Sequence, residues 1–184
     1  SEPAAGSDLA GIRTRAERDG DEWVINGQKV WTSGAHRNHY CITLVRTSGQ
    51  HGDRHKGLSQ LLVDLKTPGV TIRPIINLAG RHDWNEVTFS DAFIPEDCLI
   101  GNEGDGWLQV TSELAFERSG PERYLSTFPL LNALIDAVGP NPSTEAATQL
   151  GMLVTRLTAL RRLCISVAVS LDNGALPVAE AREL

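Results

Sequence analysis

The sequence predicts an α+β protein, in which an antiparallel β-barrel or sandwich domain is followed by part of an α-helical bundle. Two observations predict this class. From Gly11 to about Phe93, short β-prone runs alternate with turn residues, which is typical of antiparallel sheets. After residue 106, apolar residues recur three or four positions apart, as in helices that pack on other helices. We therefore expect a β-domain over residues 1–103 and a partial helical domain over residues 104–184.

Strands are predicted wherever β-prone residues stand between turn residues. The runs lie at residues 12–16, 22–25, 28–32, 40–46, 59–64, 70–74 and 86–90. Asn26-Gly27 separates the second run from the third, and this dipeptide is the strongest short-range signal for a two-residue hairpin turn. We therefore expect a β-hairpin that turns at Asn26-Gly27.

Two helices are predicted after the strands. The first follows Trp107, and Gly120-Pro121 interrupts it because proline has no amide proton to donate to the carbonyl of Glu117. The second runs from Ser143, a good N-cap residue, to the stop signal Asn173-Gly174. One apolar stripe along this second helix indicates that it packs in a helical core.

Composition excludes several classes of protein. The 184 residues carry a net charge of −6 without a run of basic residues, so we expect no nucleic-acid partner. No apolar run reaches the roughly 18 residues of a membrane span, so we expect no membrane partner. Three widely spaced cysteines indicate free thiols in a reducing compartment. The histidine pairs His36/His39 and His51/His55 lie in polar, loop-like sequence without partner ligands, so no metal site is expected.

The most informative local pattern is Trp31-Thr32-Ser33. Side chains alternate across a strand, which puts Trp31 and Ser33 on one face, roughly 7 Å apart. A flat aromatic group next to a hydroxyl suits a flat heteroaromatic ring that has an edge nitrogen to satisfy. The other interpretation is a half-buried strand tryptophan beside a solvated serine.

Several segments together resemble the middle β-domain and first C-terminal helices of the acyl-CoA dehydrogenase family. The resemblance covers residues 1 to about 125 in the family's order. The matching segments are Ser1-Glu2-Pro3 with Gly6-Ser7-Asp8, residues 26–33, 56–59, 67–70 and 95–101, Gly104-Asp105-Gly106-Trp107 and Phe116-Glu117-Arg118. Since the chain starts without methionine inside the first of these segments, we expect it to be a fragment of a longer protein.

The resemblance implies an FAD-dependent oxidoreductase that converts an acyl-CoA thioester to its 2,3-enoyl form, as in the β-oxidation of fatty acids. It also implies an electron-transfer flavoprotein as acceptor and a homotetramer or another homo- or hetero-oligomer. The expected compartment is the bacterial cytoplasm, with the mitochondrial matrix as the alternative. Two other functions stay open: a non-catalytic subunit with a structural role in a hetero-oligomer, and an acyl-CoA oxidase.

The family's FAD-binding positions fall on two segments of this sequence. By resemblance, the Ser1 hydroxyl contacts the flavin ring, and the Gly6-Ser7 loop meets the FAD, with Ser7 also reaching the acyl-CoA. The remaining positions are Trp31, Thr32 and Ser33. Trp31 is expected near the isoalloxazine, and the Ser33 hydroxyl is expected to bond flavin N5.

The family's catalytic positions point to the first predicted helix. By resemblance, Glu117 is the candidate base that removes the α-proton of the thioester, and Arg118 lies near the substrate. In many family members the base lies on a later helix, so a residue beyond the end of this chain is the alternative.

Overall fold

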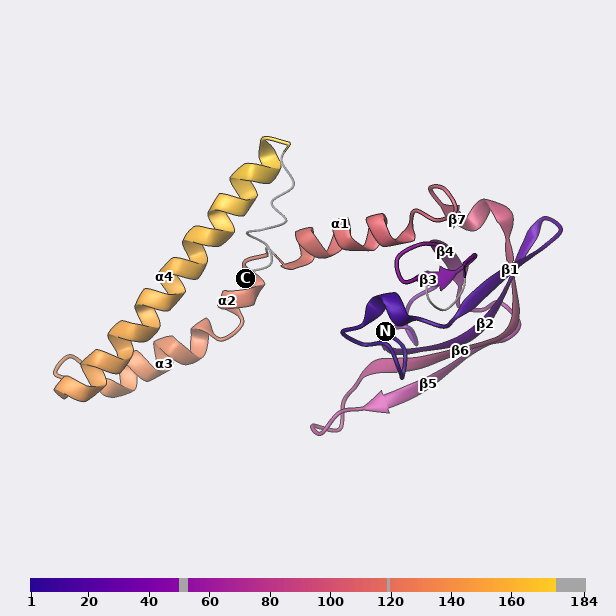
Figure 1. The fold of residues 1–184 in the computed structure, drawn as a ribbon. Helices are drawn as coiled ribbons and strands as arrows, with labels where there is room; N and C mark the ends of the chain where they lie inside the picture. Colours follow the sequence, from indigo (N-terminus) through magenta and orange to yellow (C-terminus); the bar gives the residue numbers. More distant parts are fainter. Residues whose placement is uncertain (50–52, 119, 175–184) are drawn as a thin grey trace. The chain divides into compact units, whose positions relative to one another are not determined.

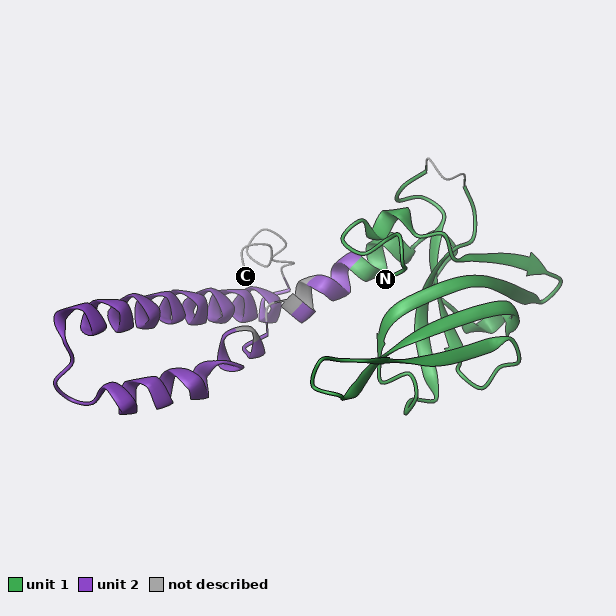
Figure 2. Cartoon of the chain, turned by 90° about the horizontal axis from the view of Figure 1, so that it is seen from below, with its two compact units in different colours: residues 1–110 green, residues 111–184 purple. Residues whose placement is uncertain are grey.

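The computed structural model describes residues 1–49, 53–118 and 120–174. The chain divides into two compact units, residues 1–110 and residues 111–184 (Figure 2). The boundary between these units falls inside the first helix, whereas the domain boundary expected from sequence at residue 103 stays a prediction.

The first unit is a seven-stranded sheet of the order β5-β6-β2-β1-β3-β4-β7 (Figure 1). The strands are β1 (Arg15–Asp19), β2 (Glu22–Ser33), β3 (Tyr40–Arg46), β4 (Leu58–Asp64), β5 (Val70–Ile76), β6 (His82–Pro95) and β7 (Leu99–Ile100). Every neighbouring pair is antiparallel except β1 and β3, which meet in parallel at a single residue pair, Arg15 and Arg46. The sheet curves without closing, because its edge strands β5 and β7 do not pair. The α+β class predicted from sequence is confirmed.

The prediction of a hairpin turn at Asn26-Gly27 is wrong. Strand β2 runs through both residues without interruption. The chain instead reverses at Gly20-Asp21, where Asp19 of β1 pairs with Glu22 of β2 and Gly20 has a φ of 61°. A glycine at the first turn position meets the positive φ that this tight hairpin requires.

Asn26 and Gly27 serve a bulge instead of a turn. Asn26 stands opposite two residues of β6, Ser90 and Asp91, and its amide exchanges two 2.9 Å hydrogen bonds with the side chain and backbone of Asp91. Gly27 has a φ of 147°, and a Cβ atom there would lie 2.7 Å from the Cα of Thr14. The dipeptide therefore serves a bulge and a close backbone approach. The sequence pattern alone does not distinguish these two roles from a turn.

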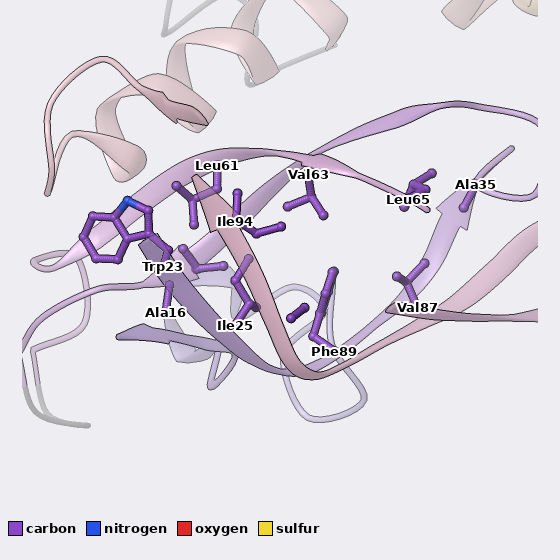
Figure 3. Close-up of a cluster of buried hydrophobic side chains, with 12 residues drawn as sticks. Ala16, Trp23, Ile25, Ala35, Leu61, Val63, Leu65, Val87, Phe89 and Ile94 are labelled. Atoms are coloured by element: carbon purple, nitrogen blue, oxygen red, sulfur yellow. The ribbon is translucent and has the colours of Figure 1, made fainter. Parts of the chain in front are cut away.

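The core of the first unit lies inside the curve of the sheet. Figure 3 shows Trp23 and Ile25 of β2 facing Leu61 and Val63 of β4, with Phe89 of β6 beside them. Each of these side chains is at most 3% exposed. Because a fully buried large apolar side chain contributes about 1.5–3 kcal/mol, this cluster is the main source of the sheet's stability.

Helix α1 (Gly106–Arg118) starts against the sheet. A Cβ atom on Gly106 would lie 2.7 Å from the backbone of Leu58, so the helix begins in contact with β4. Trp107 and Val110 pack on a second apolar cluster, which consists of Ala5, Ile12, Leu44 and Leu58. Single 3-10 turns at Leu9–Gly11 and Glu96–Cys98 complete this unit.

The second unit is helical. Its helices after α1 are α2 (Glu122–Leu125), α3 (Phe128–Val138) and α4 (Thr144–Asp172). The break at Gly120-Pro121 and the long helix that follows Ser143 are confirmed, and the Ser143 hydroxyl accepts a 3.2 Å hydrogen bond from the amide of Ala146. Helix α3 was not predicted, although its apolar residues Phe128, Leu131, Ile135 and Val138 follow helical spacing. It runs beside α4 in the opposite direction (Figures 1 and 2).

The bulge at Gly27 gives a first testable prediction. Gly27→Ala combines a backbone clash with a strained φ, so we expect it to lower the free energy of unfolding by about 3 kcal/mol. Gly20→Ala is the matched control: its φ is also positive but no atom lies within 4 Å of the added Cβ, so the expected loss is about 1 kcal/mol. Urea unfolding of the full-length protein measures both, and equal losses would contradict the role of Thr14 contact.

Candidate functional site

The candidate site begins with the N-terminal loop, residues 1–8. The backbone groups of Glu2 and Ala5 exchange two 3.0 Å hydrogen bonds, which close a tight turn over Pro3 and Ala4. The carbonyl of Ser1 accepts a 3.0 Å hydrogen bond from the amide of Val30 on β2. Ser1 is therefore held beside the strand that carries Trp31.

A buried ion pair fixes this loop. The Lys29 ammonium lies 2.7 Å from Oε1 of Glu2, and both side chains are about nine-tenths buried. The Glu2 carboxylate also accepts hydrogen bonds from the backbone amides of Arg13, at 2.6 Å, and Thr14, at 3.0 Å. One carboxylate therefore joins the loop, β2 and the segment that leads into β1.

The charges of this pair shape its titration. Burial by itself raises the pKa of the Glu2 carboxyl, but the charge of Lys29 and the hydrogen bonds donated to the carboxylate outweigh burial, so the pKa lies below its ordinary value. Burial lowers the pKa of the Lys29 ammonium, against the opposing effect of Glu2. A carboxylate with three donors is the stable state of Glu2 near neutral pH.

Trp31 sits in a second bulge of the same strand. Lys29 pairs with Val87 and Thr32 pairs with Asn85, so two residues of β2, Val30 and Trp31, stand opposite one residue of β6. Trp31 has a φ of 63°, which is uncommon for a bulky residue. Bulges of this kind re-aim a side chain and are frequent beside active sites.

Trp31 and Ser33 lie on an exposed surface of the sheet. Trp31 is 59% exposed, and its ring meets that of Trp84 edge to face, with centroids 6.2 Å apart. Ser33 is also exposed and is the direct cross-strand neighbour of Trp84, and such neighbours project from the same face of a sheet. The indole and the hydroxyl expected from sequence therefore gather with a second indole, which the sequence analysis missed.

This set of side chains fits a flavin. An exposed, flat indole offers a surface on which a tricyclic ring can rest, and the hydroxyls of Ser1, Thr32 and Ser33 can donate to nitrogen and oxygen atoms at its edge. Ser1 comes to this place through its bond to the neighbouring Val30. The Trp31 and Ser33 positions thus have the exposure that a flavin contact needs.

The Gly6-Ser7 segment is exposed and is bordered by an anchored loop. Asp8 forms an ion pair with Arg54, and the ring of His55 stacks on Trp107 with centroids 4.2 Å apart. The loop around Arg54 is held from below by the buried guanidinium of Arg46, which donates to the carbonyls of Asp53, at 2.9 Å, and Lys56, at 3.0 Å, and to that of Ala10. Exposed backbone on a fixed support is suited to meeting a ligand.

The candidate catalytic residues lie in the helical unit. Glu117 is exposed near the end of α1, and Arg118 is the last residue of that helix. The side chain of Arg118 lies outside what the structure describes. Glu117 and Arg118 belong to one unit, and the Trp31 and Ser33 positions belong to the other.

Four residues of the site carried no role in the sequence analysis. Glu2 and Lys29 form the buried ion pair, Trp84 of β6 contacts the Trp31 ring, and Asn85 of β6 bonds the Thr32 carbonyl. The sequence did contain a signal for Lys29. A lysine that lies on the same buried side of a strand as Ile25 needs a partner for its charge. The signal for Trp84 and Asn85 depends on strand register, which the local pattern does not give.

Two searches of the described residues bear on metal and membrane binding. Over residues 1–49, 53–118 and 120–174, no three histidine, cysteine or acidic side chains group in a way that could hold a metal ion. His51, one of the histidines weighed from sequence, lies outside the described residues. None of the described helices has the length and apolarity to cross a membrane.

Comparisons with known proteins identify the family of the chain. The profile of the acyl-CoA dehydrogenase middle domain matches residues 1–92. The chain is 55% identical over 118 residues to the acyl-CoA dehydrogenase IpdE1 of Mycobacterium tuberculosis, which is 64% of this chain and 30% of that protein. The chain therefore belongs to the acyl-CoA dehydrogenase family.

Solved structures of the family share the fold. The structure titled Tcur3481-Tcur3483 steroid ACAD G363A variant has a TM-score of 0.89 and 30% identity, over 98% of this chain and 48% of that one. The ChsE4-ChsE5 complex from Mycobacterium tuberculosis has a TM-score of 0.80 and 31% identity, again over 98% of this chain and 48% of the other. The chain thus spans about half the length of these structures.

The ion pair gives a second prediction. Because removal of one partner leaves the other charge buried alone, we expect Glu2→Gln or Lys29→Met to cost about 3–5 kcal/mol of unfolding free energy. The double variant should cost clearly less than the sum of the two single changes, since it leaves no lone charge. Chemical unfolding of the full-length variants measures this, and strict additivity would show that the two side chains do not interact.

The pKa of Glu2 gives a third prediction. Its value is lowered by folding, so the unfolded chain binds more protons and the stabilisation is lost as pH falls through the folded pKa, below the ordinary carboxyl value of about 4.3. Above that ordinary value the stabilisation is fully present. We expect the difference in unfolding free energy between the parent and Glu2→Gln to shrink as the pH falls from 5 to 3, because folding then no longer keeps Glu2 ionised. Urea titrations at each pH measure this difference. A constant difference would contradict a paired carboxylate.

Proposed function

We propose that the chain is the flavin-binding part of an FAD-dependent acyl-CoA dehydrogenase, which oxidises an acyl-CoA thioester to the 2,3-enoyl-CoA. The observation that supports this most directly is the exposed Trp31 ring on a bulge beside Ser33, with Ser1 tied to the same strand. Bound FAD would supply the acceptor for hydride from the β-carbon of the substrate.

The proposed role of the first unit, residues 1–110, is to hold and orient the flavin. With FAD bound, Trp31 would provide the surface for the ring, and the Ser33 hydroxyl would be the hydrogen-bond donor to flavin N5. Ser1 would contact the ring from the N-terminal loop, and the Gly6-Ser7 loop would meet the FAD and the acyl-CoA. Because Glu2 and Lys29 fix the loop from beneath, these contacts are organised before a ligand arrives.

The base that we assign to the reaction is Glu117. It lies one residue before the end of α1, next to the break at Gly120-Pro121, and its carboxylate would remove the α-proton of the thioester. Arg118, at the helix terminus, would lie near the substrate.

The relatives support a proposal for the substrate class and the partners. One structural relative is titled a steroid ACAD, so a polycyclic acyl-CoA is the first substrate to test. Another is a complex of two differently named chains, which supports an oligomer, either of one chain or of two. Electron-transfer flavoprotein as electron acceptor, a role in β-oxidation and a place in the bacterial cytoplasm complete the proposal.

The test is an anaerobic titration of the full-length protein with acyl-CoA thioesters, followed in the visible spectrum. The thioesters tested range from a steroid-derived CoA ester to straight-chain acyl-CoAs. We expect the flavin absorption band to bleach with one of these classes. A protein that carries no flavin, or a flavin that no thioester reduces, would contradict the proposal. Release of hydrogen peroxide in air would identify an oxidase.

The assignment of the base gives a fourth prediction. We expect Glu117→Gln to lower the rate of flavin reduction by about 10²–10⁴-fold with little effect on flavin content. Glu113→Gln, one turn earlier on the exposed side of α1, is the matched control and should retain the parent rate. Stopped-flow spectroscopy measures both rates. If the Glu117→Gln enzyme keeps the parent rate, Glu117 is not the base, and the alternative is a residue outside this chain.

A second candidate function is a non-catalytic subunit, which the two-chain ChsE4-ChsE5 complex favours as an alternative. Such a subunit would keep the fold and the packing without the chemistry. In that case the oligomer would turn over substrate, and Glu117→Gln and Trp31→Ala would both leave its rate unchanged.

A further inference from the structure

The clearest buried polar group that the proposed function does not use is the side chain of Asn85 on β6. Asn85 is 0% exposed, although asparagine is usually found at the surface. It is the cross-strand partner of Thr32, the residue that directly follows the bulge of Val30 and Trp31. A buried amide of this kind requires several hydrogen bonds to balance its lost hydration.

The Asn85 amide makes three such contacts. Its nitrogen lies 3.0 Å from the carbonyl oxygen of Thr32 and 3.1 Å from Nδ1 of His36, and its oxygen lies 2.7 Å from Nε2 of His82. The rings of His36 and His82 stack on each other, with centroids 3.7 Å apart and planes inclined by 20°. The two histidines therefore form a wall around the amide.

One backbone atom fixes the whole arrangement. A carbonyl oxygen only accepts, so the amide atom next to Thr32 must be the nitrogen, which donates. The other N–H then points at Nδ1 of His36, which accepts it. The Asn85 oxygen faces His82, whose Nε2 must carry a proton. All three groups are satisfied in this one arrangement.

We propose that Asn85 is a positioning residue for Trp31 and Ser33, the side chains assigned to the flavin, and this inference rests on the proposed function. Trp31 in the bulge and Thr32 directly after it both contact β6: Trp84 meets the Trp31 ring on the exposed side, and Asn85 bonds the Thr32 carbonyl on the buried side. Trp31 keeps its positive φ only while its neighbours hold it. Asn85 supplies that hold and so sets the direction of the Trp31 indole and the Ser33 hydroxyl.

The experiment compares Asn85→Ala with Asn26→Ala in the full-length protein. Asn26 is the matched control, because its amide also makes two hydrogen bonds at a bulge between β2 and β6, but at the bulge that does not carry Trp31. Two indoles as close as Trp31 and Trp84 give an exciton-coupled pair of far-ultraviolet circular dichroism bands. Trp84→Phe identifies these bands by abolishing them.

We expect Asn85→Ala to lose the exciton bands, in the flavin-free protein as well as in the loaded one, whereas Asn26→Ala keeps them. In the loaded enzyme, Asn85→Ala should shift the flavin visible spectrum and lower kcat by about tenfold or more, with a smaller change in KM, since a misplacement of about 1 Å costs up to 10²-fold. His82→Phe, which keeps a ring to stack but removes the donor to Asn85, should move the same readouts less.

Two results would overturn the inference. Exciton bands that survive Asn85→Ala would show that the amide does not hold Trp31, and lost bands with an unchanged flavin spectrum and kcat would show that the hold does not matter to the flavin. If Asn85→Ala does not fold, Asn85→Ser is measured in the same way and decides the same question. A parent protein without flavin would contradict the proposed function alone, because the exciton bands still test the hold on Trp31.

Discussion

The buried contact between Glu2 and Lys29 is the constraint on which the candidate site depends. The carboxylate accepts from the Lys29 ammonium and from the backbone amides of Arg13 and Thr14, so it links three segments that are distant in sequence. A backbone hydrogen bond between Ser1 and Val30 also holds the N-terminal loop on β2. The exposed residues of the loop thus rest on a pair that is itself buried.

The two bulges between β2 and β6 show how one pair of strands serves two purposes. At the first, Gly27 allows the backbone to approach Thr14, which benefits packing. At the second, Trp31 takes a strained backbone conformation while its ring stays 59% exposed and meets Trp84 edge to face. Strain in an exposed aromatic residue is the pattern expected where structure is given up for binding.

Local signals predicted the elements of the fold better than their pairing. The strand at Tyr40–Arg46 and the helix after Ser143 follow from residues next to each other in the chain, so the sequence pattern found them. Asn26-Gly27 was misread because the partner of β2 at that point is Asp91, far along the sequence, and a bulge and a turn select the same dipeptide. Trp84 and Asn85 escaped notice for the same reason. The indole and hydroxyl at Trp31 and Ser33 were found because their spacing lies within one strand.

The exposed apolar side chains of α3 and α4 have a consequence for laboratory work on this sequence. Leu130 is 72% exposed, and Leu134 and Leu153 lie with it along one groove between the two helices. Hydrophobic surface of this extent attracts other chains. A recombinant product limited to these 184 residues would therefore need a detergent, a fusion partner or a shortened helical segment to stay monodisperse during purification.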